Sequence, residues 1–411
     1  MFAAMKVLYI SYDGMTDPLG QSQVIPYLAG LSAKGFSITL ISCEKKERFE
    51  KLSGHISKLL KENNIRWEPV PYSTLPSVLS KRLNLSAIGK KARKICNETK
   101  PDVVHCRSYM AALIGLQLKR KYNTKFIFDM RGFWADERID GKIWNLKNTL
   151  HKNIYRYFKK KELEFLDAAD QTISLTQNAK DEILSWKAFR EKKIPITVIP
   201  CCADLDLFSK KSIDLQQLDT TKNKLKITPD DFVISYLGSI GTWYMLEEML
   251  DFFKLLLLKK PTAKFLFITP DHESMIQEAA ANKGIAKERI IVVSAQRKEV
   301  PLYLSLSQIA IYFIKPLYSK KASSPTKTAE IMGLGIPTIT NSGIGDSDAI
   351  LRDSQAGMLI NDFSTQEYDR IIEQIDVLLR TDKTKIIQAS QQYFSLEKGV
   401  ELYYGAYQQL K

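Results

Sequence analysis

A chain of 411 residues is too long for one ordinary hydrophobic core, so two domains of similar size are expected. Its 45% hydrophobic and 10% aromatic content indicates a globular protein and excludes a disordered one. The five cysteines lack the paired spacing of a zinc site and of a disulfide framework, which favours a reducing, cytoplasmic location.

The positive charge is concentrated in the first half of the chain. Residues 1–200 contain 35 Lys+Arg and 20 Asp+Glu, or +15, whereas the other 211 residues contain 25 and 26, or −1. Nucleic acid and an anionic membrane surface are both possible partners, but no nucleic-acid motif accompanies the charge. Segments 75–95 and 144–161 mix apolar and basic residues, so each is either an interfacial amphipathic helix or a solvated helix face. No apolar run is long enough to span a bilayer, so the expectation is a cytoplasmic protein that is either soluble or peripheral at the inner face of the membrane.

Short apolar runs at 6–11, 37–42, 103–105, 125–128 and 171–175 are typical of buried strands, and helical patterns lie between most of them. Strands that alternate with helices predict a doubly wound parallel sheet. Ligands bind such sheets at the carboxyl ends of the strands. His105 is the last residue of one of these predicted strands and is expected to be a structural rather than a catalytic histidine.

Two of the loops that follow these strands carry candidate ligand-binding residues. Gly20 and Gln21 lie after the first strand, where the absence of a G-x-G-x-x-G pattern argues against an NAD site. After the 125–128 strand, Arg131 could bind phosphate through two hydrogen bonds, and Asp136 or Glu137 could bind acceptor hydroxyls. A salt-bridged loop explains the same residues equally well.

The strand–helix pattern restarts after a boundary predicted near residue 200. A polar stretch at 209–230 is interpreted as a linker or an irregular excursion, and strands are expected at 232–237, 264–268 and 290–293. The loop after 232–237 is rich in glycine and hydroxyl residues at a helix start, which favours phosphate binding. Its candidate ligands are Gly238, Ser239, Gly241 and Thr242. The loop 294–298, with Arg297, is a candidate site for the nucleotide base.

The last strand–helix–strand unit has the most informative pattern. Strands are expected at 308–314 and 337–340, with a helix between them that Ser324 caps and Gly333 and Gly335 terminate. Lys327 in the first turn opposes the helix dipole, which indicates an anionic partner. Glu330 lies three residues later on the same face. A lysine for phosphate and a carboxylate for sugar hydroxyls suit a nucleoside diphosphate, although a capped helix with a solvated Lys/Glu pair fits the spacing equally well.

The stretch Ser323–Pro337, Ser-Ser-Pro-Thr-Lys-x-x-Glu-x-Met-x-x-Gly-x-Pro, precedes Asn-Ser-Gly-Ile-Gly-Asp at Asn341–Asp346. Together they resemble the donor-site motif of the retaining glycosyltransferases of family 4. The resemblance implies the GT-B fold: two doubly wound Rossmann-like domains that face a central cleft. It implies an acceptor domain at 1–200, a donor domain at 201–390, and a final helix, 391–411, that packs back on the first domain.

The family's ribose-binding glutamate falls on Glu330, and we expect catalytic roles for Lys327, Glu330 and Arg131. The predicted donor-binding residues are Gly238, Ser239, Gly241, Thr242, Arg297, Ser324, Thr326, Lys327 and Glu330. The sequence departs from the family at three places. Ala322 replaces a second glutamate, Arg131 replaces a frequent histidine, and 238–243 lacks the usual Arg and Lys for the diphosphate.

The predicted activity is transfer of a hexose-type sugar, with retention, from a UDP-sugar to an acceptor hydroxyl. The acceptor is expected to be a glycan or lipid-linked glycan in cell-envelope polysaccharide synthesis, and neither a cofactor nor a metal ion is expected. Two alternatives stay open: a nucleotide-sugar epimerase of the same fold, and a non-catalytic basic module that binds membrane or nucleic acid.

Overall fold

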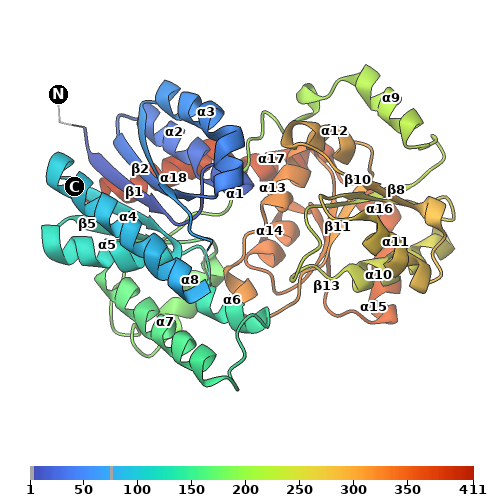
Figure 1. The fold of residues 1–411 in the computed structure, drawn as a ribbon. Helices are drawn as coiled ribbons and strands as arrows, with labels where there is room; N and C mark the ends of the chain where they lie inside the picture. The colour runs from blue at the N-terminus through green and yellow to red at the C-terminus, as the bar shows by residue number, and fades with distance from the viewer. Residues whose placement is uncertain (1–3, 75–76) are drawn as a thin grey trace. The chain divides into compact units, whose positions relative to one another are not determined.

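The computed structural model describes residues 4–74 and 77–411. They form two compact units: the chain up to Pro200 together with Leu396–Lys411, and Cys201–Ser395 (Figure 1). The first two residues of the basic segment predicted at 75–95, and residues 1–3 of the predicted acceptor domain, lie outside the described residues.

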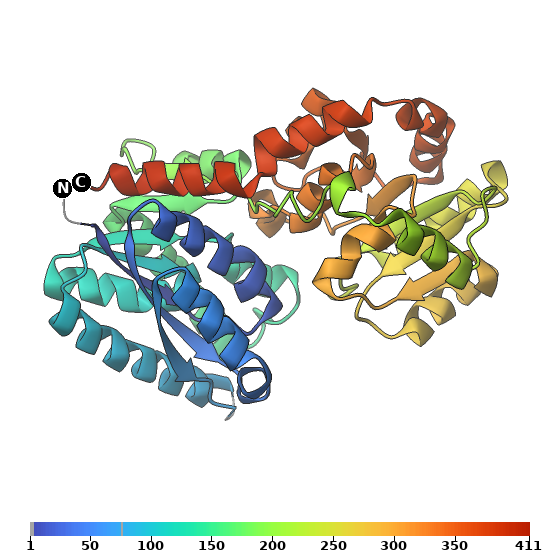
Figure 2. The same ribbon diagram turned by 90° about the horizontal axis from the view of Figure 1, so that it is seen from above.

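The described part of the first unit contains a seven-stranded parallel sheet of order β3-β2-β1-β4-β5-β6-β7, flanked by helices (Figures 1 and 2). The order reverses between β1 and β4, so the loops after these two strands diverge and leave space for a ligand. The strands are β1 (Lys6–Ser11), β2 (Ser37–Glu44), β3 (Ile65–Pro71), β4 (Val103–Arg107), β5 (Lys125–Asp129), β6 (Gln171–Ser174) and β7 (Ile196–Val198). The helices are α1 (Pro18–Gln23), α2 (Ile25–Ala33), α3 (Lys46–Glu62), α4 (Ser77–Thr99), α5 (Ser108–Tyr122), α6 (Trp134–Asp140), α7 (Thr149–Ala168), α8 (Gln177–Ser185) and α18 (Leu396–Gln408).

Prolines explain two differences from the predicted elements of this unit. The helical pattern between the predicted strands at 6–11 and 37–42 forms two helices, separated at Val24, where φ is −128° and ψ is −62°. Pro26 in the first turn of α2 has no N–H with which to continue α1. Strand β3 was not predicted, because Pro69 and Pro71 conceal its pattern. Proline is tolerated there because β3 lies at the edge of the sheet.

Helix α18 returns the chain to the first unit (Figure 2). It starts at Leu396 because Ser395 still pairs with Ala203 of the second unit in a parallel bridge. The close approach of α2 to α18 depends on Gly30, since a Cβ there would lie 2.5 Å from the side chain of Val400.

The second unit contains a parallel sheet of order β10-β9-β8-β11-β12-β13, which reverses between β8 and β11. Its strands are β8 (Val233–Leu237), β9 (Lys264–Ile268), β10 (Ile290–Val293), β11 (Ile309–Tyr312), β12 (Thr338–Asn341) and β13 (Gly357–Ile360). Its α-helices are α9 (Leu215–Lys224), α10 (Leu246–Lys259), α11 (Glu273–Asn282), α12 (Val300–Leu304), α13 (Thr326–Gly333), α14 (Ser347–Ser354), α15 (Thr365–Glu373), α16 (Ile375–Leu379) and α17 (Lys383–Phe394). Short 3₁₀ helices are η1 (Lys210–Ser212), η2 (Lys287–Arg289), η3 (Arg297–Glu299) and η4 (Tyr318–Ala322).

The prediction of a linker or an irregular excursion at 209–230 is wrong, because this stretch contains the helix α9. Asp214 caps it by accepting hydrogen bonds from the backbone N–H groups of Gln216 and Gln217 at 2.8 and 3.3 Å. The hydrophobic core of the second unit includes fully buried aromatic residues of α10, β9 and β11. The predicted fold class, two doubly wound Rossmann-like sheets, is confirmed.

Candidate active site

The start of α13 differs from the predicted capping. The helix begins at Thr326 with Pro325 in the N-cap position, and no side chain in the described chain caps it. The hydroxyl of Ser324 instead accepts a hydrogen bond from the backbone N–H of Cys201 at 3.0 Å. Ser324 therefore fixes the loop before the helix, and Thr326, half-buried, holds the first helical position.

Lys327 is almost completely buried, and its ammonium lies against aromatic rings. Its Nζ is 3.6 Å from the ring centroid of Tyr244, 4.3 Å from that of Tyr236 and 5.6 Å from that of Tyr312. Within the described residues, this Nζ has no hydrogen-bond partner. Burial lowers the pKa of Lys327 well below its usual value, although the nearby charge of Glu330 opposes this shift. A buried ammonium without an acceptor is costly, so this position favours an anionic ligand.

The loop after β8 brings backbone next to this ammonium. Gly238 has φ +108°, and a Cβ there would lie 3.1 Å from the Nζ of Lys327, so only glycine fits without strain. The loop is held by Asp271, whose carboxylate accepts hydrogen bonds from the Ile240 N–H at 2.5 Å and from the Ser239 hydroxyl at 3.2 Å.

Gly241 and Thr242 of the same loop are exposed. Sequence reasoning missed Asp271 and the three tyrosines around Lys327. The signal for Asp271 was its position directly after the predicted strand at 264–268.

Glu330 and Arg297, both predicted to bind the donor, contact each other. Arg297 Nη1 donates to Glu330 Oε1 at 2.8 Å, and the guanidinium lies over the ring of Phe208, 5.1 Å from its centroid. The Glu330 side chain is 8% exposed and that of Arg297 is 41% exposed. Ala322, where many family members have a second acid, is buried in η4.

The first unit contains a cavity of about 300 Å³ beyond the carboxyl ends of β1 to β5. This is the position at which doubly wound sheets bind ligands. Its lining residues are Tyr12, Asp13, Asp17, Cys43, Lys45, Tyr72, Lys81, Ser108, Met110, Trp134, Arg138, Ile143 and Trp144. Gly20 and Gln21 do not line it. A Cβ on Gly20 would lie 2.3 Å from the carbonyl oxygen of Gly14, so glycine is required for α1 to pack on the preceding loop.

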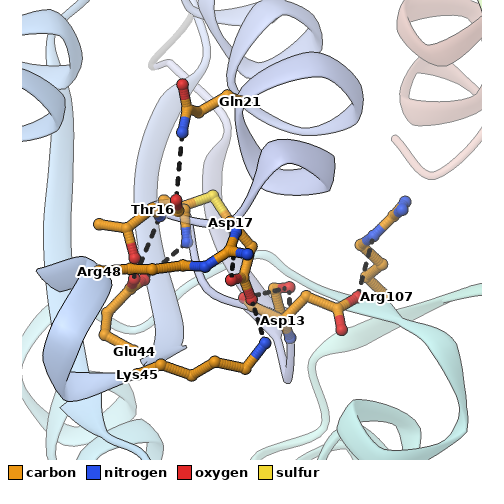
Figure 3. Close-up of polar contacts among 10 residues, drawn as sticks. Asp13, Thr16, Asp17, Gln21, Glu44, Lys45, Arg48 and Arg107 are labelled. Atoms are coloured by element: carbon orange, nitrogen blue, oxygen red, sulfur yellow. Dashed lines mark hydrogen bonds and ion pairs between the residues drawn. The ribbon is translucent and has the colours of Figure 1, made fainter. Parts of the chain in front are cut away.

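A buried carboxylate fixes this loop, as Figure 3 shows. Glu44 accepts hydrogen bonds from the Met15 N–H at 2.7 Å and from the N–H and hydroxyl of Thr16 at 3.2 and 2.6 Å. Gln21 donates to the carbonyl oxygen of Thr16 at 3.1 Å. Gln21 and Glu44 thus do not line the cavity but hold the loop that forms one of its walls. The sequence did not predict this role for Glu44.

Acidic residues that line the cavity are already paired with cations. Asp17 lies 3.0 Å from Lys45 and 3.2 Å from Arg48, and Asp13 lies 3.8 Å from Arg107. Figure 3 shows these pairs at the loop.

The loop after β5 holds Arg131 in the left-handed region, at φ +59°. Its Nη1 is 3.8 Å from Oδ1 of Asp129, which is fully buried and accepts a hydrogen bond from the Tyr403 hydroxyl at 3.1 Å. Burial opposes ionisation of Asp129, but the nearby Arg131 and His105 hold its pKa below the usual value. His105 Nδ1 is 2.6 Å from the Tyr407 hydroxyl, a contact typical of a structural histidine.

Asp136 is buried, and both of its carboxylate oxygens are bonded to α7. They accept hydrogen bonds from the Tyr155 hydroxyl at 2.8 Å and from Lys159 at 2.9 Å. Glu137 is half-buried in the first turn of α6. Acceptor binding by Asp136 stays a prediction that requires loss of one of these partners. From the same helix, Trp134 and Arg138 are the residues that line the cavity.

The predicted donor residues therefore all lie in the second unit, and Lys327, Gly238, Glu330 and Arg297 lie at one edge of its sheet. Arg131, Gly20, Gln21, Asp136 and Glu137 lie in the first unit.

Among residues 4–74 and 77–411, no helix is long and apolar enough to cross a lipid bilayer.

Comparison with known families and structures agrees with this fold. Residues 20–207 match the model of Glycosyltransferase Family 4, and residues 218–392 match that of Glycosyl transferases group 1. The chain is 21% identical over 223 residues to the capsular polysaccharide biosynthesis glycosyltransferase CapM of Staphylococcus aureus. That match covers 53% of this chain and 54% of CapM, so it spans about half the length of that relative.

Solved structures share the fold at low sequence identity. Sucrose-phosphate synthase of Thermosynechococcus elongatus has 14% identity and a TM-score of 0.74, with 99% of both chains covered. HepE of Anabaena, solved in complex with UDP and glucose, has 12% identity and a TM-score of 0.69, covering 98% of this chain and 99% of its own. With both halves of the chain matched by glycosyltransferase models and the fold shared with these solved structures, the protein belongs to the glycosyltransferases of family 4 with the GT-B fold.

Proposed function

We propose that this glycosyltransferase moves a hexose-type sugar from UDP to an acceptor hydroxyl, with retention of the anomeric configuration. The observation that carries the proposal is the buried ammonium of Lys327, without a hydrogen-bond acceptor in the described chain and adjacent to Gly238. An ammonium beside exposed backbone at a strand end is suited to a diphosphate. The structure of HepE with UDP and glucose supports UDP as the nucleotide.

In the proposed reaction the bond between sugar C1 and the diphosphate oxygen breaks, and the oxygen keeps the electron pair. The acceptor hydroxyl forms the new bond to C1 on the same face, and its proton passes to the departing phosphate oxygen. Lys327 stabilises the charge that develops on that oxygen. Glu330 binds ribose hydroxyls, and Arg131 keeps the catalytic role that the sequence predicts for it. We assign no step to a metal ion.

The test is calorimetric binding of UDP, GDP, ADP and CMP to the wild type and to Lys327→Ala and Glu330→Ala variants. One diphosphate should bind at micromolar level, and each variant should lose roughly ten- to hundredfold in affinity, as expected for hydrogen bonds to charged groups. Unchanged binding by the Lys327→Ala variant would show that the donor site lies elsewhere. Once the donor sugar is known, product analysis with and without EDTA tests metal independence. NMR of the product then tests retention, and release of an epimerised sugar without acceptor would identify an epimerase.

We further propose that the acceptor is a lipid-linked glycan of a cell-envelope polysaccharide, which the enzyme reaches from the cytoplasmic face of an anionic membrane. The supporting feature is α7, where Leu150 and Tyr157 are exposed seven residues apart. Lys152, Arg156 and Lys160 are exposed at four-residue spacing on the same helix. Parallel rows of apolar and basic side chains suit an interfacial helix.

Vesicle flotation tests this partner. The protein should float with phosphatidylglycerol vesicles and not with phosphatidylcholine vesicles, and Arg156→Gln with Lys160→Gln should weaken the binding. Lys210→Gln with Lys211→Gln is the matched control, because these lysines are exposed in the second unit. Equal loss in both double variants would contradict a role for α7.

A further inference from the structure

The cavity of the first unit has an unbalanced charge. Its carboxylates, Asp13 and Asp17, are paired with cations. Lys81 of α4 and Arg138 of α6 also line it, and neither has a carboxylate or hydrogen-bond partner for its cationic group among the described residues. The two positive side chains thus line one cavity without a compensating anion.

The surroundings of Lys81 disfavour its positive charge, as expected for a site that an anionic ligand would neutralise. Partial burial, and then repulsion by Arg138, lower the pKa of Lys81. The guanidinium of Arg138 is held over the ring of Trp134, 5.0 Å from its centroid, which fixes it at the cavity wall. Two like charges near each other are unfavourable unless a ligand lies between them.

Another part of the cavity wall is aromatic. Trp134 and Trp144 both line the cavity, and their rings meet edge to face with centroids 5.4 Å apart. Aromatic walls with a few fixed polar groups are typical of small-molecule sites, and a flat indole can pack against the apolar face of a sugar ring. The lining therefore combines a surface for a sugar ring with two cations for an anionic substituent.

We propose that this cavity binds an anionic acceptor, a sugar bearing a phosphate or a carboxylate group, and that Lys81 and Arg138 hold the anionic group. This inference rests on the proposed glycosyl transfer and specifies its acceptor. The anion is either a phosphoryl group, as at the lipid end of a linked glycan, or the carboxylate of a uronic acid. Both chemistries give the same charged hydrogen bonds to lysine and arginine.

The test uses the full chain, saturated with the nucleoside diphosphate that binds it so that the donor site is filled. Glucose 6-phosphate, methyl glucuronide and the neutral methyl glucoside are titrated while tryptophan fluorescence is recorded. At least one anionic probe should bind about tenfold or more tightly than the glucoside, since a charged hydrogen bond contributes a factor of this size. The anion that binds distinguishes phosphate from carboxylate. Equal affinity for all three probes would overturn the proposal.

Lys81→Gln and Arg138→Gln should each weaken the anionic probe about tenfold, with nucleotide binding unchanged. Lys90→Gln is the control, because Lys90 is exposed on α4 and does not line the cavity. Lys81→Glu should abolish anion binding and raise the melting temperature, because the new carboxylate pairs with Arg138. If Lys81 served only to stabilise the fold, Lys81→Glu would lower the melting temperature and leave probe binding unchanged. That result would contradict the proposal.

The same titrations separate the failure of this inference from the failure of the proposed function. If no nucleotide binds, the anionic probes are titrated into the protein alone. Binding that depends on Lys81 would then support the cavity as an anion site although the donor assignment had failed. If the nucleotide binds normally and no anionic probe is preferred, the donor assignment stands and the cavity inference is overturned.

Discussion

Arg297 donates a hydrogen bond to Glu330, with 2.8 Å between Nη1 and Oε1. The Glu330 side chain is mostly buried and that of Arg297 is partly exposed, so the pair fixes the carboxylate while leaving the arginine open to solvent. An ionised carboxylate is an acceptor only, and hydroxyl groups are its natural partners. The contact therefore supports the proposal that Glu330 binds the hydroxyls of a ribose.

Glu330→Gln should weaken UDP binding by roughly ten- to hundredfold, because it removes a charged acceptor for the ribose hydroxyls. The variant should also lose discrimination against dideoxy-UDP, which the wild type is expected to bind as weakly as the variant binds UDP. Calorimetric titration of both nucleotides measures this, with the exposed Glu373→Gln as control. A variant that weakens both nucleotides equally would show that Glu330 does not contact the ribose.

Binding of the diphosphate should be accompanied by proton uptake at Lys327. Burial lowers the pKa of this lysine in the free protein, and phosphate charge beside the ammonium would raise it again. Between the two pKa values the free enzyme lacks the proton that the complex holds. Titrations in buffers of different ionisation enthalpy, repeated at several pH values above the second phosphate pKa of about 6, should therefore report uptake within that interval. Lys327→Met should bind weakly with no uptake, and proton release by the wild type would contradict the prediction.

The same lysine should make the stability of the free protein depend on pH. Its folded-state pKa lies below that of an unfolded lysine, about 10.4, so the unfolded chain binds more protons in the interval between the two values. The free energy of unfolding should therefore rise with pH across that interval, and below it the full cost of burying the charge is present. Urea unfolding of the wild type and of Lys327→Met over this range tests the slope, which the variant should lack.

Gly238→Ala should damage nucleotide binding more than it damages the fold. The added Cβ would lie 3.1 Å from the Nζ of Lys327, at a φ of +108° that costs alanine about 1–2 kcal/mol. Gly284→Ala is the matched control, because Gly284 also has a positive φ, +75°, but a Cβ there would meet no atom. Both variants should lose similar stability in thermal unfolding, and only Gly238→Ala should lose affinity for UDP. Equal affinities would mean that the ligand does not approach Gly238.

The alternation of strand and helix was readable from the sequence because the core strands are short, continuous apolar runs. The sequence pattern did not reveal elements whose residue types are unusual for that kind of element. Pro69 and Pro71 hide the edge strand β3, and polar residues conceal the capped helix α9. Tertiary contacts stabilise these elements, and local residue propensity is too weak to predict them.

The candidate site was predictable to the extent that its residues are adjacent in sequence. Lys327 and Glu330 share one helix face, whereas the pair of Glu330 with Arg297 joins residues 33 positions apart. The tyrosines around Lys327 come from β8, β11 and the loop before α10, so no spacing reveals them. Serine is a common N-cap residue, but the hydroxyl of Ser324 accepts a hydrogen bond from the backbone N–H of Cys201 instead of capping α13.

Tyr403→Phe should destabilise the first unit by about 1.5–3 kcal/mol, as expected for loss of a hydrogen bond to a buried charged group. Tyr403 lies on α18 and donates to Asp129, which in turn lies 3.8 Å from Arg131. Tyr404→Phe is the matched control, because Tyr404 is the next residue on the helix and is only half-buried. Urea unfolding at neutral pH, followed by tryptophan fluorescence, should show the loss in Tyr403→Phe alone.

The loss of stability caused by Tyr403→Phe should become smaller as the pH falls. The folded-state pKa of Asp129 is depressed, so its ionised form contributes stability above the unfolded pKa of about 3.9, and this contribution disappears as the pH falls through the folded value. The difference between wild type and Tyr403→Phe should therefore be largest near neutral pH and shrink in acid. A difference that stays constant down to strongly acidic pH would mean that the tyrosine stabilises α18 by packing alone. The hydrogen bond to Asp129 would then play no part in holding the carboxylate beside Arg131.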